Sequence, residues 1–146
     1  MVVVASAAVA AELAGTSRVR IVRNDEPERG MNHSLRLADA AISAAEPIAV
    51  LLADLPDCDA GVVSQVVNAY DDGVDVVVPQ AGERLGHPVV FGPAARRGIA
   101  GLGDGDGLHR LRDATGLRRR IVAVGDARVF DDIDTEAELA ARAARD

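Results

Sequence analysis

Residues 47–56 read Pro-Ile-Ala-Val-Leu-Leu-Ala-Asp-Leu-Pro, and the fold class follows from this segment. An apolar run of this kind predicts a strand over 47–53 that is buried on both faces, as strands of parallel sheets are. Asp54 therefore lies at the carboxyl end of the predicted strand. Pro56 has no amide proton to donate, so the hydrogen-bonded strand cannot continue past it. Because ligands of parallel α/β sheets bind at the carboxyl ends of strands, Asp54 is the first candidate functional residue.

On both sides of this segment, short apolar runs alternate with helical patterns. The patterns predict further strands over 2–4, 18–23, 75–79, 88–91 and 120–124, and helices over 6–14, 33–45, 59–70, 93–100, 108–114 and 135–145. Strands separated by helices imply right-handed crossovers, and therefore an α/β fold with a mostly parallel sheet and helices on both faces. No repeat or long linker divides the chain, so we expect one domain over residues 1–146.

The composition is that of a globular protein, with 49% hydrophobic and 27% charged residues in 146. The net charge of −7 argues against a nucleic-acid partner and against an anionic membrane surface. All 16 basic residues are Arg. Cys58 is the only cysteine, which excludes an internal disulfide and a Cys-based zinc site and fits a reducing cytoplasm. We expect its thiol to be buried and inert.

The apolar start of the chain does not predict a signal peptide. Residues 2–11 lack a basic leading segment, and Glu12 ends the run early. No run approaches the roughly 18 to 20 apolar residues that span a bilayer. We therefore expect a cytoplasmic protein without a membrane partner.

Two acidic segments are candidates for a metal site. Asp54 at a strand end can bind Mg²⁺, which prefers oxygen ligands. Asp131, Asp132 and Asp134 directly precede the last helix, and extended geometry puts Asp132 and Asp134 on one face. Each segment also has a structural interpretation: Asp54 as a turn residue that caps the next helix, and the later acids as stabilisers of the helix N-terminus.

Three further segments carry polar or glycine-rich patterns. Residues 30–34, Gly-Met-Asn-His-Ser, can offer donors and acceptors at a helix start, or they are ordinary loop residues in which His33 is exposed. Residues 86–88, Gly-His-Pro, can approach a ligand before a strand, or they form a turn with a solvent-facing His87. The Gly/Asp turn over 103–107, followed by Arg110, can hold an anionic substrate, but it lacks the Glu of a calcium loop.

The order of these segments resembles the MobA-like nucleotidyltransferases, and within them the molybdenum cofactor cytidylyltransferases. The resemblance implies a Rossmann-like three-layer sandwich, similar to nucleotide-diphospho-sugar transferases. It implies Mg²⁺-dependent transfer of CMP or GMP, with CTP favoured as donor, to a phosphorylated pterin-type precursor such as molybdopterin, with release of pyrophosphate. A transient contact with a molybdoenzyme or a chaperone is also implied.

The same resemblance assigns roles to individual residues. It implies catalytic roles for Asp54 and Asp134; metal binding by Asp54, Asp132 and Asp134; nucleotide binding by Asn24, Gly30 and Ser34; and acceptor binding by Gly86, His87, Pro88 and Arg110. Which of Asp132 and Asp134 binds metal stays open.

The chain departs from the family pattern at its start. The family begins with a strand, a Gly-rich phosphate loop with Arg and then a Lys, whereas this chain begins at what resembles the second strand and contains no Lys. We therefore expect an N-terminally truncated form of the fold. Two other functions stay open: a phospholactate guanylyltransferase-like enzyme, and a non-catalytic ligand-binding remnant or partner-dependent subunit.

Overall fold

The computed structural model describes residues 1–143 and shows a mixed α/β protein whose chain passes repeatedly between two units. Unit 1 combines Met1–Ile48 with Gly92–Leu117, and unit 2 combines Ala49–Phe91 with the segment from Arg118 onward. The expectation of one domain over 1–146 stays a prediction. Within residues 1–143, no helix has the length and apolar character that a membrane crossing requires.

Unit 1 is built on a two-stranded parallel sheet. Its elements are β1 (Val2–Ala5), α1 (Ala7–Glu12), β2 (Arg20–Arg23), η1 (Pro27–Arg29), α2 (Met31–Ala40), α4 (Pro93–Arg96), η2 (Ile99–Gly101) and α5 (His109–Arg112). β1 and β2 pair in parallel, with Val3 opposite Ile21. Both predicted strands of this unit form. Of its predicted helices, the one over 93–100 is divided into α4 and η2, and α2 begins two residues before the expected start and ends at Ala40 rather than at residue 45.

Arg96 ties together the loop after α2. Its side chain is 5% exposed, and its guanidinium donates to the Asp39 carboxylate at 2.7 Å and to the Ser43 carbonyl at 2.6 Å. A buried guanidinium is tolerated when its donors are satisfied in this way. The predicted helix over 33–45 therefore ends early, because the carbonyls after Ala40 bond to Arg96 instead of continuing the helix.

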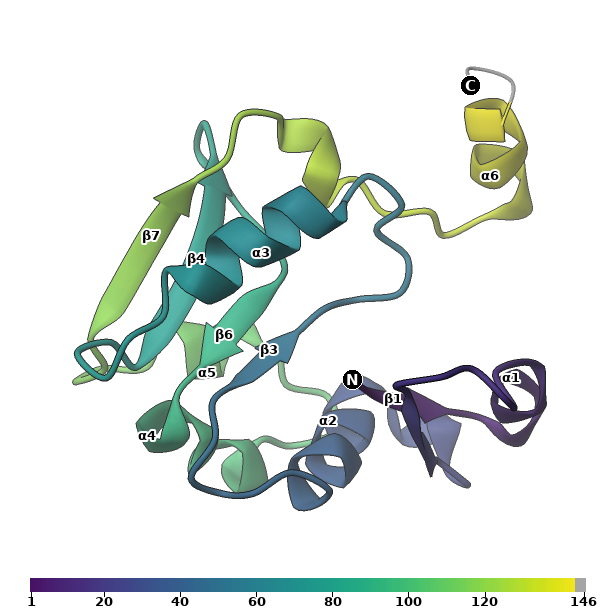
Figure 1. Cartoon of the computed structure of the whole chain (residues 1–146), viewed down its shortest axis with the longest axis horizontal. Coiled ribbons are helices and arrows are strands. Elements are labelled where there is room, and N and C mark those ends of the chain that lie inside the picture. The colour runs from purple at the N-terminus through teal and green to yellow at the C-terminus, as the bar shows by residue number, and fades with distance from the viewer. Residues whose placement is uncertain (144–146) are drawn as a thin grey trace. The chain divides into compact units, whose positions relative to one another are not determined.

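Unit 2 contains the larger sheet. Its elements are β3 (Ile48–Val50), α3 (Ala60–Asn68), β4 (Val76–Ala81), β5 (Arg84–Leu85), β6 (Val89–Phe91), β7 (Arg119–Ala123), η3 (Ala127–Phe130) and α6 (Glu136–Ala143). The strand order is β3-β6-β4-β5, and β7 pairs with β4. α3 packs against β4 and β6, and Figure 1 shows it lying across these strands. Asp59 caps α3 as predicted, since its carboxylate accepts from the Val62 amide at 2.9 Å.

The prediction of a mostly parallel sheet is wrong for unit 2. β4 pairs in parallel with β7 but antiparallel with both β5 and β6. The reason is the length of the connections: only residues 82–83 separate β4 from β5, whereas a parallel partner needs a crossover of about a dozen residues or more. Gly82 has a φ of +58°, which suits a two-residue hairpin turn.

The segment over 47–53 forms a shorter strand than expected. β3 covers only Ile48–Val50, and Leu51 is 46% exposed. Because β3 lies at the end of the strand order, it has a strand neighbour on one side only. β4 is the strand with the predicted two-sided burial, and Val76, Val77 and Val78 are each 0% exposed.

Candidate metal site and substrate-binding residues

Asp54 lies in a turn four residues after the end of β3, whereas the sequence predicts a strand that reaches residue 53. Its side-chain Oδ1 is buried and has no hydrogen-bond partner. A buried carboxylate oxygen without a partner carries a desolvation cost, so such groups are usually paired with a donor or a cation. Asp59, not Asp54, caps α3. The Oδ1 of Asp54 can therefore bind a cation.

The second acidic segment contacts Asp54 through the backbone. The Ile133 amide donates to the Asp54 carbonyl at 3.0 Å, so Asp132 and Asp134 flank the contact point. Both carboxylates belong to exposed residues. Among residues 1–143, no three His, Cys, Asp or Glu side chains converge into a metal-binding group. The structure thus brings the two predicted acidic segments together without gathering all three predicted ligands.

Asp134 also belongs to the start of α6. Glu138 Oε2 accepts from the amides of Asp134 at 3.0 Å and Thr135 at 2.9 Å, and the Glu138 amide donates to Thr135 Oγ1 at 3.2 Å. This is a capping box, and it confirms Thr135 as the predicted cap. The bonds from Thr135 and Asp134 hold the pKa of Glu138 below its usual value. The part of the predicted helix after residue 143 lies outside the described residues.

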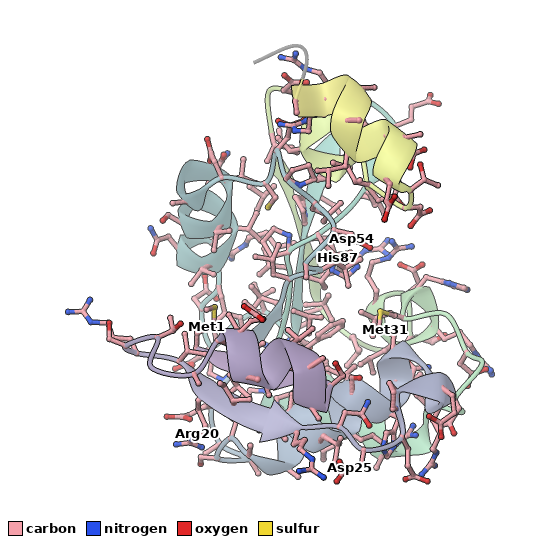
Figure 2. All side chains as sticks on the ribbon, turned by 90° about the vertical axis from the view of Figure 1, so that its right-hand side faces the viewer. Met1, Arg20, Asp25, Met31, Asp54 and His87 are labelled. Carbon is pink, nitrogen blue, oxygen red and sulfur yellow. The ribbon has the colours of Figure 1, made fainter. Side chains whose placement is uncertain are left out.

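His87 lies just before β6, which is the neighbour of β3 in the sheet. Its Nδ1 is 3.1 Å from the Val50 carbonyl, and because a carbonyl oxygen can only accept, Nδ1 is the donor in this hydrogen bond. His87 is half-buried, and its peptide bond to the buried Pro88 is cis. Figure 2 labels His87 and Asp54, which come from the segments beside these two strands.

Gly86 has a packing role. A Cβ at this position would lie 2.2 Å from Phe130 Cδ1, so the Phe130 ring leaves no room for a side chain. Cys58 is half-buried beside this segment, with Sγ 3.9 Å from the His87 carbonyl, and burial raises the pKa of its thiol. The side chain is thus half-buried rather than buried as we expected, and the inertness of the thiol stays a prediction.

The predicted nucleotide-binding residues lie in unit 1. Asn24 is 4% exposed, and its Nδ2 donates to Ser34 Oγ at 3.0 Å while its Oδ1 accepts from the Glu26 amide at 2.9 Å. Gly30 precedes α2 with a φ of +84°, a conformation that favours glycine. Asn24 and Ser34 thus bond to each other and shape the loop before α2.

The Gly/Asp turn over 103–107 is fixed to η1 and α2 by side chains whose partners the sequence does not reveal. Asn32 is 1% exposed, and its Nδ2 donates to the Gly103 carbonyl at 2.7 Å and the Asp106 carbonyl at 2.8 Å. Arg36 and Arg29 both pair with the Asp104 carboxylate and lower its pKa. Arg110, predicted to bind the acceptor, forms an ion pair with Asp106. The partners of Asn32 lie about 70 residues away, so no local pattern signals its role.

Arg84 is the residue of unit 2 that sequence reasoning missed. Its guanidinium bonds to the carboxylate of Asp131 at 2.8 Å and to backbone carbonyls of η3. β5, which carries Arg84, has only two residues, so no periodic pattern marks its position.

The residues around Asp54 fit a magnesium-type ion. Mg²⁺ is usually bound through one or two carboxylates, with water and substrate phosphates as the other ligands. The unpartnered Asp54 Oδ1 is one such carboxylate oxygen, and the segment that carries Asp132 and Asp134 is hydrogen-bonded to the Asp54 carbonyl. A closed cage of three or more protein ligands is not required for this type of site.

In α/β folds, ligands bind at the carboxyl ends of strands, which is the region that holds the Asp54 turn and the second acidic segment. The chain matches the MobA-like NTP transferase domain over residues 1–124, and it belongs to that family. Membership supports a nucleotidyltransferase. No curated protein matches the chain significantly.

Solved structures show the same fold. Rv0371c from Mycobacterium tuberculosis has a TM-score of 0.80 at 21% identity, and the match covers 99% of this chain and 75% of that one. A homologue of Rv0371c from Mycobacterium sp. strain JC1 has a TM-score of 0.75 at 22% identity, covering 99% and 73%. A structure of the M. tuberculosis protein in complex with manganese has a TM-score of 0.74 at 21% identity, covering 96% and 74%.

Proposed function

We propose that the protein is a divalent-metal-dependent nucleotidyltransferase in which Asp54 holds the metal ion. The observation that carries the proposal is the buried Oδ1 of Asp54, which has no hydrogen-bond partner. Membership of the MobA-like NTP transferase family supports the reaction class. The manganese complex of Rv0371c supports a divalent ion of this type, and we propose Mg²⁺ or Mn²⁺ for this chain.

In the proposed reaction, the acceptor phosphate attacks the α-phosphorus of a nucleoside triphosphate, and pyrophosphate leaves. Such transfers depend chiefly on positioning and on neutralising charge. The bound ion supplies charge neutralisation at the triphosphate. Asp54 would orient the ion, and Asp132 or Asp134 would supply the second carboxylate. The Ile133–Asp54 backbone bond supports this assignment, because it joins the two segments that carry these acids.

For the substrates we propose CTP as donor and a small phosphorylated pterin as acceptor. Asn24, Gly30 and Ser34 would bind the nucleotide, and Gly86, His87, Pro88 and Arg110 would bind the acceptor. Support for His87 is its fixed ring orientation, because Nδ1 is hydrogen-bonded to the Val50 carbonyl at 3.1 Å.

The test is a titration of the whole chain with Mn²⁺. Binding is measured by calorimetry and by the loss of the paramagnetic signal of free Mn²⁺. We expect one saturable site that Mg²⁺ displaces, and tighter binding of CTP when the metal is present. Release of pyrophosphate from CTP with a phosphorylated pterin, compared with GTP, then tests the reaction. A chain that binds neither ion saturably would contradict the proposal.

A further inference from the structure

Arg84 joins the β4–β5 hairpin to the segment that carries the second group of acids. Nη1 donates to Asp131 Oδ1 at 2.8 Å and to the Ala127 carbonyl at 3.4 Å, and Nη2 donates to the Phe130 carbonyl at 3.3 Å. Arginine often satisfies the last carbonyls of a helix in this way. One side chain therefore holds η3 and the residue that follows it.

The same two segments also meet through packing. Phe130 is 8% exposed, and its ring occupies the space in which a Cβ of Gly86 would lie. The residues from Arg84 to Gly86 thus contact Phe130 and Asp131 at two separate points. The hairpin fixes the position of the chain immediately before Asp132.

Asp132 lies between two anchored neighbours. On one side Asp131 is bonded to Arg84, and on the other side the Ile133 amide is bonded to the Asp54 carbonyl. With residues 131 and 133 both fixed, the backbone at Asp132 has little freedom. The anchors keep Asp132 next to the point where its segment contacts Asp54.

The stabilising effect of the Arg84–Asp131 ion pair itself is small. The side chains are 53% and 55% exposed, and exposed pairs contribute between about 0 and 1 kcal/mol. The effect of Arg84 should therefore be measurable in the geometry of the acidic segment more than in the free energy of unfolding.

We propose that Arg84 is a positioning residue for the metal site, acting through the segment 127–131 on Asp132 and its contact with Asp54. This inference rests on the proposed function, because it takes the acids of unit 2 as metal ligands. Groups that orient metal ligands from outside typically change metal affinity by about 10- to 100-fold when they are removed.

The test compares Mn²⁺ affinity in the whole chain for the wild type, Arg84→Ala and Arg84→Lys. We expect Arg84→Ala to weaken binding about tenfold and Arg84→Lys to retain part of the affinity through the Asp131 contact. The direction of the change in Mn²⁺ affinity separates two effects. Loss of the positive charge of Arg84 would by itself strengthen cation binding, so weaker binding in Arg84→Ala indicates lost positioning.

Arg120→Ala is the matched control. Arg120 is also exposed, lies in unit 2, and bonds to a carbonyl (Ala69, 2.6 Å) and a carboxylate (Asp71, 2.7 Å). We expect its Mn²⁺ affinity to equal that of the wild type and its melting temperature to match that of Arg84→Ala.

The outcomes separate the two proposals. Wild-type affinity in Arg84→Ala, or equal weakening in Arg120→Ala, would overturn the positioning role and leave the metal site intact. Absence of saturable Mn²⁺ binding by the wild type would overturn the metal site and the positioning role together. If circular dichroism shows that Arg84→Ala is unfolded, the comparison of Arg84→Lys with Arg120→Lys tests the positioning role instead. We then expect weaker Mn²⁺ binding only in Arg84→Lys.

Discussion

Among single residues, Asp54 has the clearest signature of a metal ligand, because its buried, unpartnered Oδ1 belongs to a carboxylate, whereas the other such atom among the described residues, Asn32 Oδ1, belongs to a neutral amide. We predict that Asp54→Asn weakens Mn²⁺ binding at least tenfold, since a neutral amide replaces the carboxylate ligand that the ion prefers. Relief of the buried charge should leave the melting temperature unchanged or slightly higher. Asp72→Asn, which makes the same charge change at an exposed position, should bind Mn²⁺ as the wild type does. Equal affinity in both variants would exclude Asp54 as a ligand.

Gly86 provides a test of packing at the same scale. A methyl group at this position would lie 2.2 Å from Phe130 Cδ1, so Gly86→Ala must displace the ring or the hairpin. Overpacking of this kind costs about 1 to 3 kcal/mol, and we expect that loss in urea unfolding. Gly82→Ala is not a suitable control because of its positive φ. Gly125→Ala, which meets no atom within 4 Å, should cost much less.

Some of these residues could be predicted from sequence and others could not. Asp54 follows an apolar strand and precedes a proline, so a local pattern reveals its place. Arg84 bonds to the Phe130 carbonyl, 46 residues away, and Asn32 bonds to the Gly103 carbonyl, 71 residues away. No local pattern encodes contacts over such separations. The predicted roles of Asn24, Gly30 and Ser34 stay predictions, although the structure explains how their loop is held.

Among the elements, α6 depends on its capping box. Thr135→Ala removes the Oγ1 that accepts from the Glu138 amide, and the loss of such a cap costs about 1 kcal/mol. We predict faster hydrogen exchange of the amides in α6, with α3 unchanged. Ser64→Ala, on the exposed side of α3, is the control. Equal exchange in the two variants would mean that other contacts hold the start of α6.

The sheet shows where element-level prediction fails. The long strand β4 and the helix α3 follow from the sequence, because their apolar patterns are extensive and Asp59 marks the helix start. The direction of pairing does not follow, because it depends on β5, which has two residues, and on a turn of two residues. Elements this short carry too few residues for a periodic signal.

For the whole molecule, ion pairs predict the response to acid. Arg142 lowers the pKa of Asp57 from its usual 3.8, and Arg36 and Arg29 lower that of Asp104. A depressed pKa contributes stability that is complete above the unfolded value and is lost as the pH falls through the folded value. We therefore predict that the melting temperature is steady above pH 5 and falls below about pH 4.

Salt is the control for that pH profile. The pairs are exposed, so 1 M NaCl should reduce the fall by screening them. A melting temperature that stays constant from pH 6 to pH 3 would show that these pairs do not contribute to folding.

The division of each unit between two chain segments has a consequence for biosynthesis. Residues 49–91 emerge from the ribosome before Gly92–Leu117, and β7 follows only after that second segment of unit 1. At translation rates of about 5 to 20 residues per second, β4 waits for roughly one to several seconds with one edge unpaired. During that interval the nascent chain exposes the unpaired edge of β4 at its all-valine start, which is the kind of surface that a ribosome-associated chaperone protects from pairing with another chain.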